Sequence, residues 1–208
     1  MPACAVCGAS CRPPYRAPTA ELAPDLDGRP GEPARSTLKR WVATCRGCGA
    51  AAPDLAALPP SAAATVRSDA YAAVKSPFLR WAAIAEAAGD RAAAAEAILQ
   101  AAWEQDDAGQ DAAPLRRRAA ALWQGDPLRR IDILRRAGAF EEAAALAGSL
   151  SGLDEDAGRI VAFQRDRIRA RDAGRHMLSS ALRPPARTPH VTHGKPARPG
   201  LISRLFGR

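Results

Sequence analysis

Two short stretches, Cys4-Ala-Val-Cys7-Gly8 and Cys45-Arg46-Gly47-Cys48-Gly49, share the pattern Cys-x-x-Cys-Gly. Each cysteine pair is suited to form one half of a tetrahedral Zn²⁺ site, and the glycine lets the backbone turn sharply beneath the metal. Four thiolate ligands leave no open coordination position for water, so the pattern favours a structural metal over a catalytic one. We therefore expect a structural Zn²⁺ held by these four side chains: Cys4, Cys7, Cys45 and Cys48.

The stretch between the two pairs explains why a metal is needed. Residues 8–37 are rich in proline and have little periodic apolar pattern, so we expect them to form no core of their own. A bound zinc ion closes this loop and contributes on the order of 10 kcal/mol of folding free energy. The β-forming residues 38–44 predict a strand that enters the second pair, and a short strand near Tyr15 is its expected partner.

Other interpretations of the cysteines remain at this point. Two redox-active dithiols are one alternative, but a thioredoxin-type pair is expected on a strand-to-helix turn in a βαβ setting, which the sequence does not predict. Cys11, four residues after Cys7, is either a free thiol in a loop or a substitute ligand.

Composition indicates a mainly α-helical protein. The 208 residues are 47% hydrophobic but only 5% aromatic, and alanine supplies much of the apolar share. Alanine-rich interiors suit closely packed helices. The net charge is +8, of which residues 184–208 carry +5, so the basic character is largely a property of the tail. The high pI therefore does not by itself identify a nucleic-acid-binding domain.

We expect three parts: a zinc-ribbon-like module with a proline-rich insertion over 1–60, a helical domain over 61–182, and a disordered basic tail over 183–208.

Start and stop signals divide the helical domain. Serine, proline or aspartate begins several segments, and glycine ends two of them. The expected helices are one that starts at Ser61 or Thr65 and runs to about 75, then 77–88, 90–103, 114–123, 127–137, 140–150 and a last one from about 154.

Two hairpins in this domain resemble tetratricopeptide repeats, with small and large residues at the repeat's spacing around a turn glycine. The residues that carry this resemblance are Phe78, Trp81, Ala82, Ala85, Ala94, Ile98 and Ala101 around Gly89, and Gly138-Ala-Phe-Glu-Glu-Ala143. The two turn glycines are forty-nine residues apart rather than thirty-four. The helix at 114–124 is therefore expected to be an irregular insertion or a degenerate half-repeat.

Taken together, residues 1–182 resemble an uncharacterised bacterial family of unknown function that joins paired Cys-x-x-Cys-Gly knuckles to a tetratricopeptide-like helical body. The resemblance rests on the two cysteine knuckles, the hairpin around Gly89-Asp90 with Ala101-Ala-Trp103, and the turn at Gly138. It implies a cytoplasmic zinc-binding protein without an assigned reaction.

Two functions follow from these patterns. The first is a non-catalytic zinc-binding protein that binds a protein or peptide partner through its helical hairpins. The second is nucleic-acid binding through the zinc ribbon and an arginine-rich surface. Its expected contacts lie near the second knuckle: Arg35, Lys39, Arg40 and Arg46. We expect no enzyme, because the sequence contains no Ser/His/Asp set, phosphate-binding glycine loop or His-Glu-x-x-His helix.

The sequence also predicts a location. The chain opens with Met1-Pro-Ala-Cys4, without the charged start and apolar core of a signal peptide, and no apolar run is long enough to span a bilayer. Four of the five cysteines lie in metal-binding pairs, which is typical of a reducing compartment. We therefore expect a cytoplasmic protein.

Overall fold

The computed structural model of the chain describes residues 2–182, and in this part helices dominate, as the composition predicts. The expectation of a disordered tail falls on residues 183–208, which lie outside the described residues. The elements in chain order are the 3₁₀-helix η1 (Arg35–Arg40), strands β1 (Ala43–Thr44) and β2 (Ala51–Ala52), the 3₁₀-helix η2 (Leu55–Ala57), and helices α1 (Ala62–Val66), α2 (Asp69–Ala73), α3 (Pro77–Ala87), α4 (Arg91–Asp107), α5 (Ala113–Leu122), α6 (Pro127–Arg136), α7 (Phe140–Ser149), α8 (Glu155–Arg169) and α9 (Leu178–Leu182).

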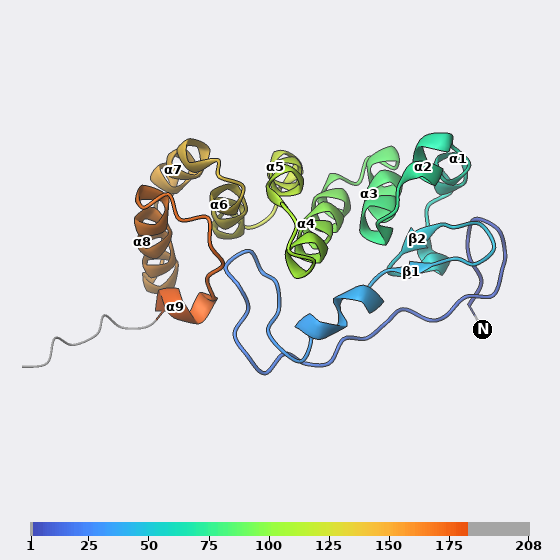
Figure 1. Cartoon of the computed structure of the whole chain (residues 1–208), viewed down its shortest axis with the longest axis horizontal. Coiled ribbons are helices and arrows are strands. Elements are labelled where there is room, and N and C mark those ends of the chain that lie inside the picture. The colour runs from blue at the N-terminus through green and yellow to red at the C-terminus, as the bar shows by residue number, and fades with distance from the viewer. Residues whose placement is uncertain (1, 183–208) are drawn as a thin grey trace, which may run out of the picture.

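Helices α1 to α8 stand side by side in a row, and the chain before β1 runs along one side of it (Figure 1). Successive helices pack on one another from α3 to α8, and α5 packs on both α4 and α6. The segment at 114–124 is thus a full member of the row. Assignment of these hairpins to tetratricopeptide repeats stays a prediction.

Most of the predicted helix boundaries are found, although the side chain of Ser76, the expected N-cap before Pro77, makes no capping hydrogen bond. Asp90, Asp126 and Asp154 each precede a helix and accept a hydrogen bond from a backbone N–H of its first turn. Gly89 and Gly138 end their helices with φ of 75° and 71°, which glycine adopts without steric cost. These local signals set the limits of α4, α6, α7 and α8.

Two local predictions are wrong. Residues 38–44 do not form one strand: the first three belong to η1, only Ala43 and Thr44 form β1, and β1 pairs with β2, not with the segment near Tyr15. The physical reason is tertiary packing, since Leu38 is buried in the core and the Trp41 ring packs edge-on against Trp103 of α4 at 6.3 Å. The expected single helix at 61–75 is two short helices, because Ser68 caps the second one.

The hydrophobic core extends from the helices into the N-terminal part of the chain. Leu38, Val42 and Ala51 belong to the same buried cluster as residues of α3 to α8. A second cluster surrounds the cysteines and includes Ile84 of α3, and Trp81 packs against both clusters. The cysteine end is therefore packed directly on the first helices of the row, while the domain boundary at residue 60 stays a prediction.

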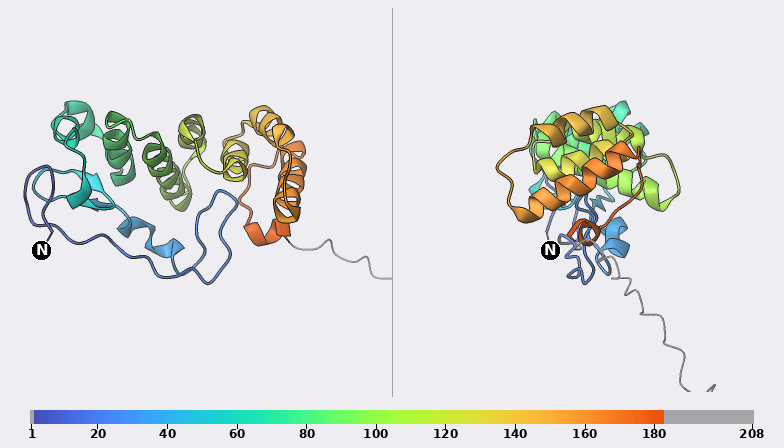
Figure 2. Two further views of the ribbon diagram at one scale, coloured as in Figure 1. Left: turned by 180° about the vertical axis from the view of Figure 1, so that it is seen from behind. Right: turned by 90° about the vertical axis from the view of Figure 1, so that its left-hand side faces the viewer.

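The segment between the knuckles, residues 12–34, is here called the strap. It leaves the cysteine end, follows the row of helices and reaches α9 at the other end (Figures 1 and 2). There the Leu26 N–H donates to the carbonyl of His176 at 3.0 Å, and the Leu178 N–H donates to the carbonyl of Pro24 at 2.8 Å. The strap thus links the two ends of the molecule.

Asp27 anchors the strap at its middle, because its fully buried carboxylate lies among cationic groups of the helices. It accepts hydrogen bonds from Trp103 Nε1 at 3.0 Å and from Arg136 at 2.6 Å, and Arg116 lies 3.7 Å away. Its backbone carbonyl accepts from Arg129 Nε at 2.9 Å. A buried charge is tolerated only when it is paired in this way. The strap therefore does have buried anchors, but they are made with the helical body.

We predict that Asp27→Ala destabilises the protein by about 3–5 kcal/mol, because it leaves Arg136 and Arg116 buried with less compensating charge. Glu155→Ala is the matched control: Glu155 pairs with Arg159 on the surface, where both side chains are exposed (78% and 47%), and its loss is expected to cost less than about 1 kcal/mol. Denaturant unfolding of the two variants measures the difference. Equal small losses would show that the strap is not anchored through Asp27.

Candidate metal centre

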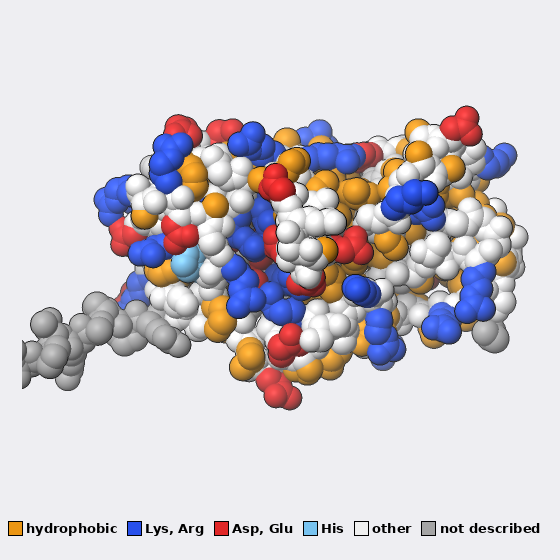
Figure 3. Space-filling view, in the orientation of Figure 1, with side chains coloured by type: hydrophobic (Ala, Val, Ile, Leu, Met, Phe, Trp, Pro, Cys, Tyr) orange, Lys and Arg blue, Asp and Glu red, His pale blue; other side chains and the backbone are white. Residues whose placement is uncertain are grey.

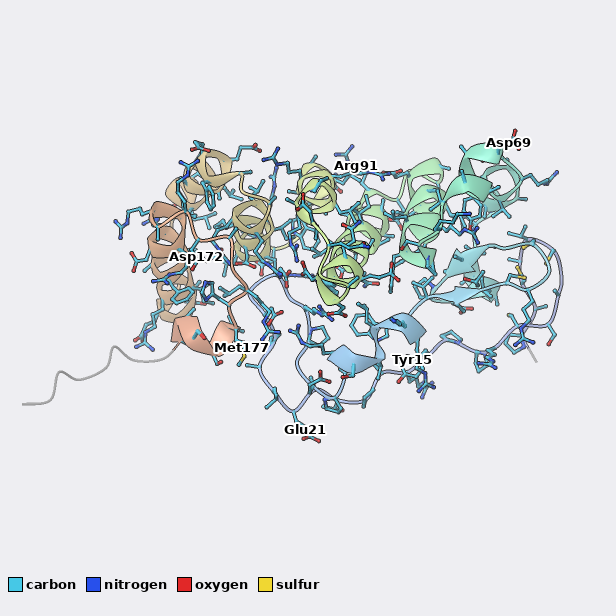
Figure 4. The ribbon with its side chains drawn as sticks, viewed as in Figure 1. Tyr15, Glu21, Asp69, Arg91, Asp172 and Met177 are labelled. Atoms are coloured by element: carbon cyan, nitrogen blue, oxygen red, sulfur yellow. The ribbon has the colours of Figure 1, made fainter. Side chains whose placement is uncertain are left out.

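The sulfurs of Cys4, Cys7, Cys45 and Cys48 meet at one point, all within 4.8 Å of one another. The Sγ atoms of Cys4 and Cys48 are 3.9 Å apart, and those of Cys7 and Cys45 are 3.6 Å apart. A tetrahedral zinc site with Zn–S bonds of about 2.3 Å has sulfur–sulfur edges of about 3.8 Å, whereas a disulfide needs about 2.0 Å. The donor set and its spacing fit one tetrahedral metal ion. Figure 4 shows sulfur atoms, in yellow, beside the β1–β2 hairpin.

Both knuckles have the same backbone geometry. In the first, the Cys4 N–H donates to the carbonyl of Ala9, and the Gly8 N–H donates to the carbonyl of Cys4, both at 2.8 Å. In the second, the Cys45 N–H donates to Ala50 at 2.8 Å, and the Gly49 N–H donates to Cys45 at 2.9 Å. The repeated Cys-x-x-Cys-Gly sequence therefore folds into two equivalent turns that present their sulfurs to each other.

Glycine is required in these turns for two reasons. Gly8 and Gly49 have φ of 73° and 76°, a left-handed conformation that side chains disfavour. Gly47 is restricted by space instead: a Cβ there would lie 3.2 Å from Cys7 Sγ and 3.1 Å from Ala9 Cβ. The role of the two glycines after the cysteines is predictable from sequence, whereas the role of Gly47 appears only when the knuckles are brought together.

The electrostatics of the sulfurs suit a metal ion. Burial acts to raise the pKa of Cys45, but the backbone N–H groups of Cys48 and Gly47 outweigh it and lower that pKa to about 7. Burial raises the pKa of Cys48 to about 12, although the Ala50 N–H partly opposes it. One thiolate therefore forms readily near neutral pH, and binding of a divalent cation has to release protons from other sulfurs.

Tyr71 supports the second knuckle and was not singled out as a site residue from the sequence. Its buried hydroxyl accepts a hydrogen bond from the Ala51 N–H at 3.0 Å and donates one to the carbonyl of Gly49 at 3.2 Å. Helix α2, which carries Tyr71, thereby fixes the turn that holds Cys45 and Cys48. No local sequence pattern points to it, because its two hydrogen bonds reach residues 20 and 22 positions away.

Cys11 does not belong to the group of four sulfurs, although it is buried in the same cluster. Its backbone N–H donates to the carbonyl of Pro2 at 2.9 Å. Burial raises the pKa of its thiol, which favours the protonated form. Of the two alternatives for Cys11, this geometry supports a free thiol over a substitute ligand.

The four cations expected to contact nucleic acid are divided by the structure. Lys39, Arg40 and Arg46 line one cavity of about 1000 Å³ beside the second knuckle. Arg35 is not among the residues that line it, because its guanidinium pairs with the buried carboxylate of Asp25 at 2.5 Å. Three of the four residues thus share a surface, and Arg35 stabilises the strap.

Fold and site together define a mainly helical protein with a candidate four-cysteine metal centre at its N-terminal end. Comparison with protein-family models, with curated proteins and with solved structures gave no match to this chain. The resemblance to a bacterial family therefore stays a prediction based on the quoted residues. In the part of the chain that the structure describes, no helix is both long and apolar enough to cross a bilayer.

We predict that Gly47→Ala weakens zinc binding roughly tenfold or more, because the added methyl group pushes against Cys7 Sγ and disturbs the support of the ligands. Gly148→Ala in α7 is the control, since a Cβ there meets nothing within 4 Å, and it should stabilise the helix by up to about 1 kcal/mol. Competition with a chromophoric zinc chelator measures the zinc affinity of both variants. Unchanged zinc affinity in the Gly47 variant would contradict the tight contact.

Proposed function

We propose that this chain is a non-catalytic zinc-binding protein of the cytoplasm that acts as an interaction module. The observation that carries the metal assignment is the convergence of the four sulfurs within 4.8 Å of one another. Zinc fits this all-thiolate set best, because soft sulfur ligands in a tetrahedron select Zn²⁺ or iron–sulfur chemistry over harder ions. With four protein ligands, such an ion has no open position for substrate, which supports a structural role.

The first knuckle shows what the ion contributes. Apart from its sulfurs, this knuckle packs into the apolar cluster that it shares with the second knuckle, and the Ala5 N–H donates a hydrogen bond to the carbonyl of Leu55 in η2 at 3.0 Å. A zinc ion adds four bonds between the two knuckles, so its binding free energy becomes folding free energy for the N-terminal end. The reducing cytoplasm keeps these thiols available for the metal.

We predict one zinc per chain in purified protein, and loss of order at the N-terminal end when a strong chelator removes it. Cys45→Ser should bind zinc poorly, whereas Cys11→Ser should retain it, because Cys11 lies outside the group of four. Elemental analysis and amide hydrogen exchange over residues 2–11 measure these outcomes. A protein without stoichiometric zinc, or one whose front end is equally protected after chelation, would contradict the structural role.

The helical row supplies the binding function in this proposal. One of its sides already holds an extended segment, because the strap lies there with Asp27 among arginines of α5 and α6. A partner protein therefore has the opposite side of the row available. Figure 4 shows Arg91 at that side and Glu21 of the strap at the other, and both side chains are exposed.

We predict that a photo-crosslinking residue at position 91 captures a protein partner in cells, whereas the same residue at position 21 does not. The two positions differ in the side of the row they report, and both substitutions leave the metal centre intact. Mass spectrometry of the crosslinked products identifies the contact. If position 21 captures partners and position 91 does not, the proposed side is wrong, and if neither does, the interaction role is wrong.

A further inference from the structure

The cavity beside the second knuckle is built from two separate stretches of the chain. One wall comes from the start of the strap, and the other comes from the end of η1, β1 and the second knuckle. Its volume is about 1000 Å³, which is larger than a single inorganic anion needs. The residues that line it are Ser10, Cys11, Arg12, Pro13, Pro14, Tyr15 and Arg16, then Lys39, Arg40, Val42, Ala43, Thr44, Cys45 and Arg46, and finally Leu55.

Apart from the metal ligand Cys45, every charged residue that lines the cavity is basic. Five cations line the cavity, and no carboxylate does: Arg12, Arg16, Lys39, Arg40 and Arg46. All five are exposed, and none forms an ion pair with another residue between positions 2 and 182. The lower right of Figure 3 shows basic side chains with no acidic ones between them. Such a group of uncompensated charges favours an anionic ligand.

The other groups of arginines in the molecule differ from this one. Arg116 and Arg136 of the helices pair with Asp27 and Asp106. On α8, Arg169 pairs with Asp166, and Arg171 just beyond the helix pairs with Glu141. Among the described residues, other cations of the helical row, such as Arg80 and Arg91, bond only to backbone carbonyls. What distinguishes the cavity is that five cations line it together and no carboxylate does.

The metal centre accounts for only part of this charge. Zinc with four thiolates carries a net charge of −2, and nearby cations stabilise such a centre. Five cations leave an excess of three positive charges after that compensation. The excess lies around the cavity mouth, where a second anion can reach it.

The floor of the cavity indicates what kind of anion fits. Val42, Leu55 and Cys11 provide a buried apolar base. At the side, the guanidinium of Arg40 lies over the Tyr15 ring, 4.2 Å from its centroid, and Figure 4 shows Tyr15 on the strap beneath η1. A planar stack of this type is a platform for a nucleic-acid base. A phosphate group alone gains nothing from contact with the apolar floor of the cavity.

We propose that this cavity binds a nucleotide segment of single-stranded nucleic acid, with a base against the Tyr15–Arg40 stack and phosphates on the surrounding cations. A paired duplex does not present unstacked bases to a concave site. An acidic peptide can pair with the cations, but it has no base that would stack on Tyr15 and Arg40. This inference goes beyond the proposed zinc role, and it depends on the metal through the second knuckle, because Cys45 lines the cavity and Arg46 lies between the ligands Cys45 and Cys48.

The test uses the full zinc-loaded chain and a fluorescent twelve-residue oligouridine in anisotropy titrations at several salt concentrations. Lys39→Gln combined with Arg46→Gln is expected to weaken binding at least about tenfold and to reduce the slope of log K against log[salt] by about 1.4, or about 0.7 for each lost phosphate contact. Tyr15→Leu, which removes a stacking surface, should weaken binding at least about fivefold.

The matched control is Arg159→Gln combined with Arg169→Gln, which removes the same charge from exposed positions of α8. Its affinity should stay close to that of the unaltered chain, including any contribution from residues 183–208. Equal weakening in both double variants would overturn the proposal, because it would show an effect of net charge alone. Tighter binding of a duplex or of a phosphorylated peptide than of the oligouridine would also overturn it. Zinc content, measured for every variant, separates these outcomes from failure of the metal centre.

Discussion

The buried carboxylate of Asp27 is the interaction on which the arrangement of the N-terminal third depends. A charge without solvent contact is unfavourable by several kcal/mol unless cations and hydrogen bonds surround it. Here the compensating groups come from three helices, because Trp103 lies on α4, Arg116 on α5 and Arg136 on α6. Any displacement of the strap from the row would leave these groups unpaired, so the strap and the spacing of the helices are set together.

The metal centre and Asp27 restrain the same length of chain in different ways. The four sulfurs close the loop at its ends, whereas Asp27 fixes its middle to α4, α5 and α6. Loop-closure entropy grows only slowly with loop length, so a crosslink at the ends alone would leave most of the strap free. Asp27, as a second anchor, holds the strap in an ordered position on the helices. The cavity wall at residues 10–16 has its own contact with η1, because the Arg40 guanidinium lies 4.2 Å from the centroid of the Tyr15 ring.

Sequence reasoning succeeded here where the deciding interaction is local. The spacing within each Cys-x-x-Cys-Gly knuckle, the capping aspartates and the turn glycines act over a few residues, and the structure places them as expected. It was wrong about 38–44, where the β-forming residues are overridden by packing of Leu38 and Trp41 on the helical core. It also missed Asp27, since a single aspartate in a proline-rich stretch has no pattern that indicates partners up to 109 residues away.

The distribution of arginine is the most informative feature that composition conceals. A net charge of +8 describes the whole chain, yet many arginines of the helical row neutralise carboxylates, and Arg35 does the same for Asp25 of the strap. Paired charges of this kind contribute to folding and create little external field. The five cations around the cavity have no such partner among the described residues. Because these five cations line one cavity and no carboxylate does, the cavity is an electropositive site that favours an anionic ligand.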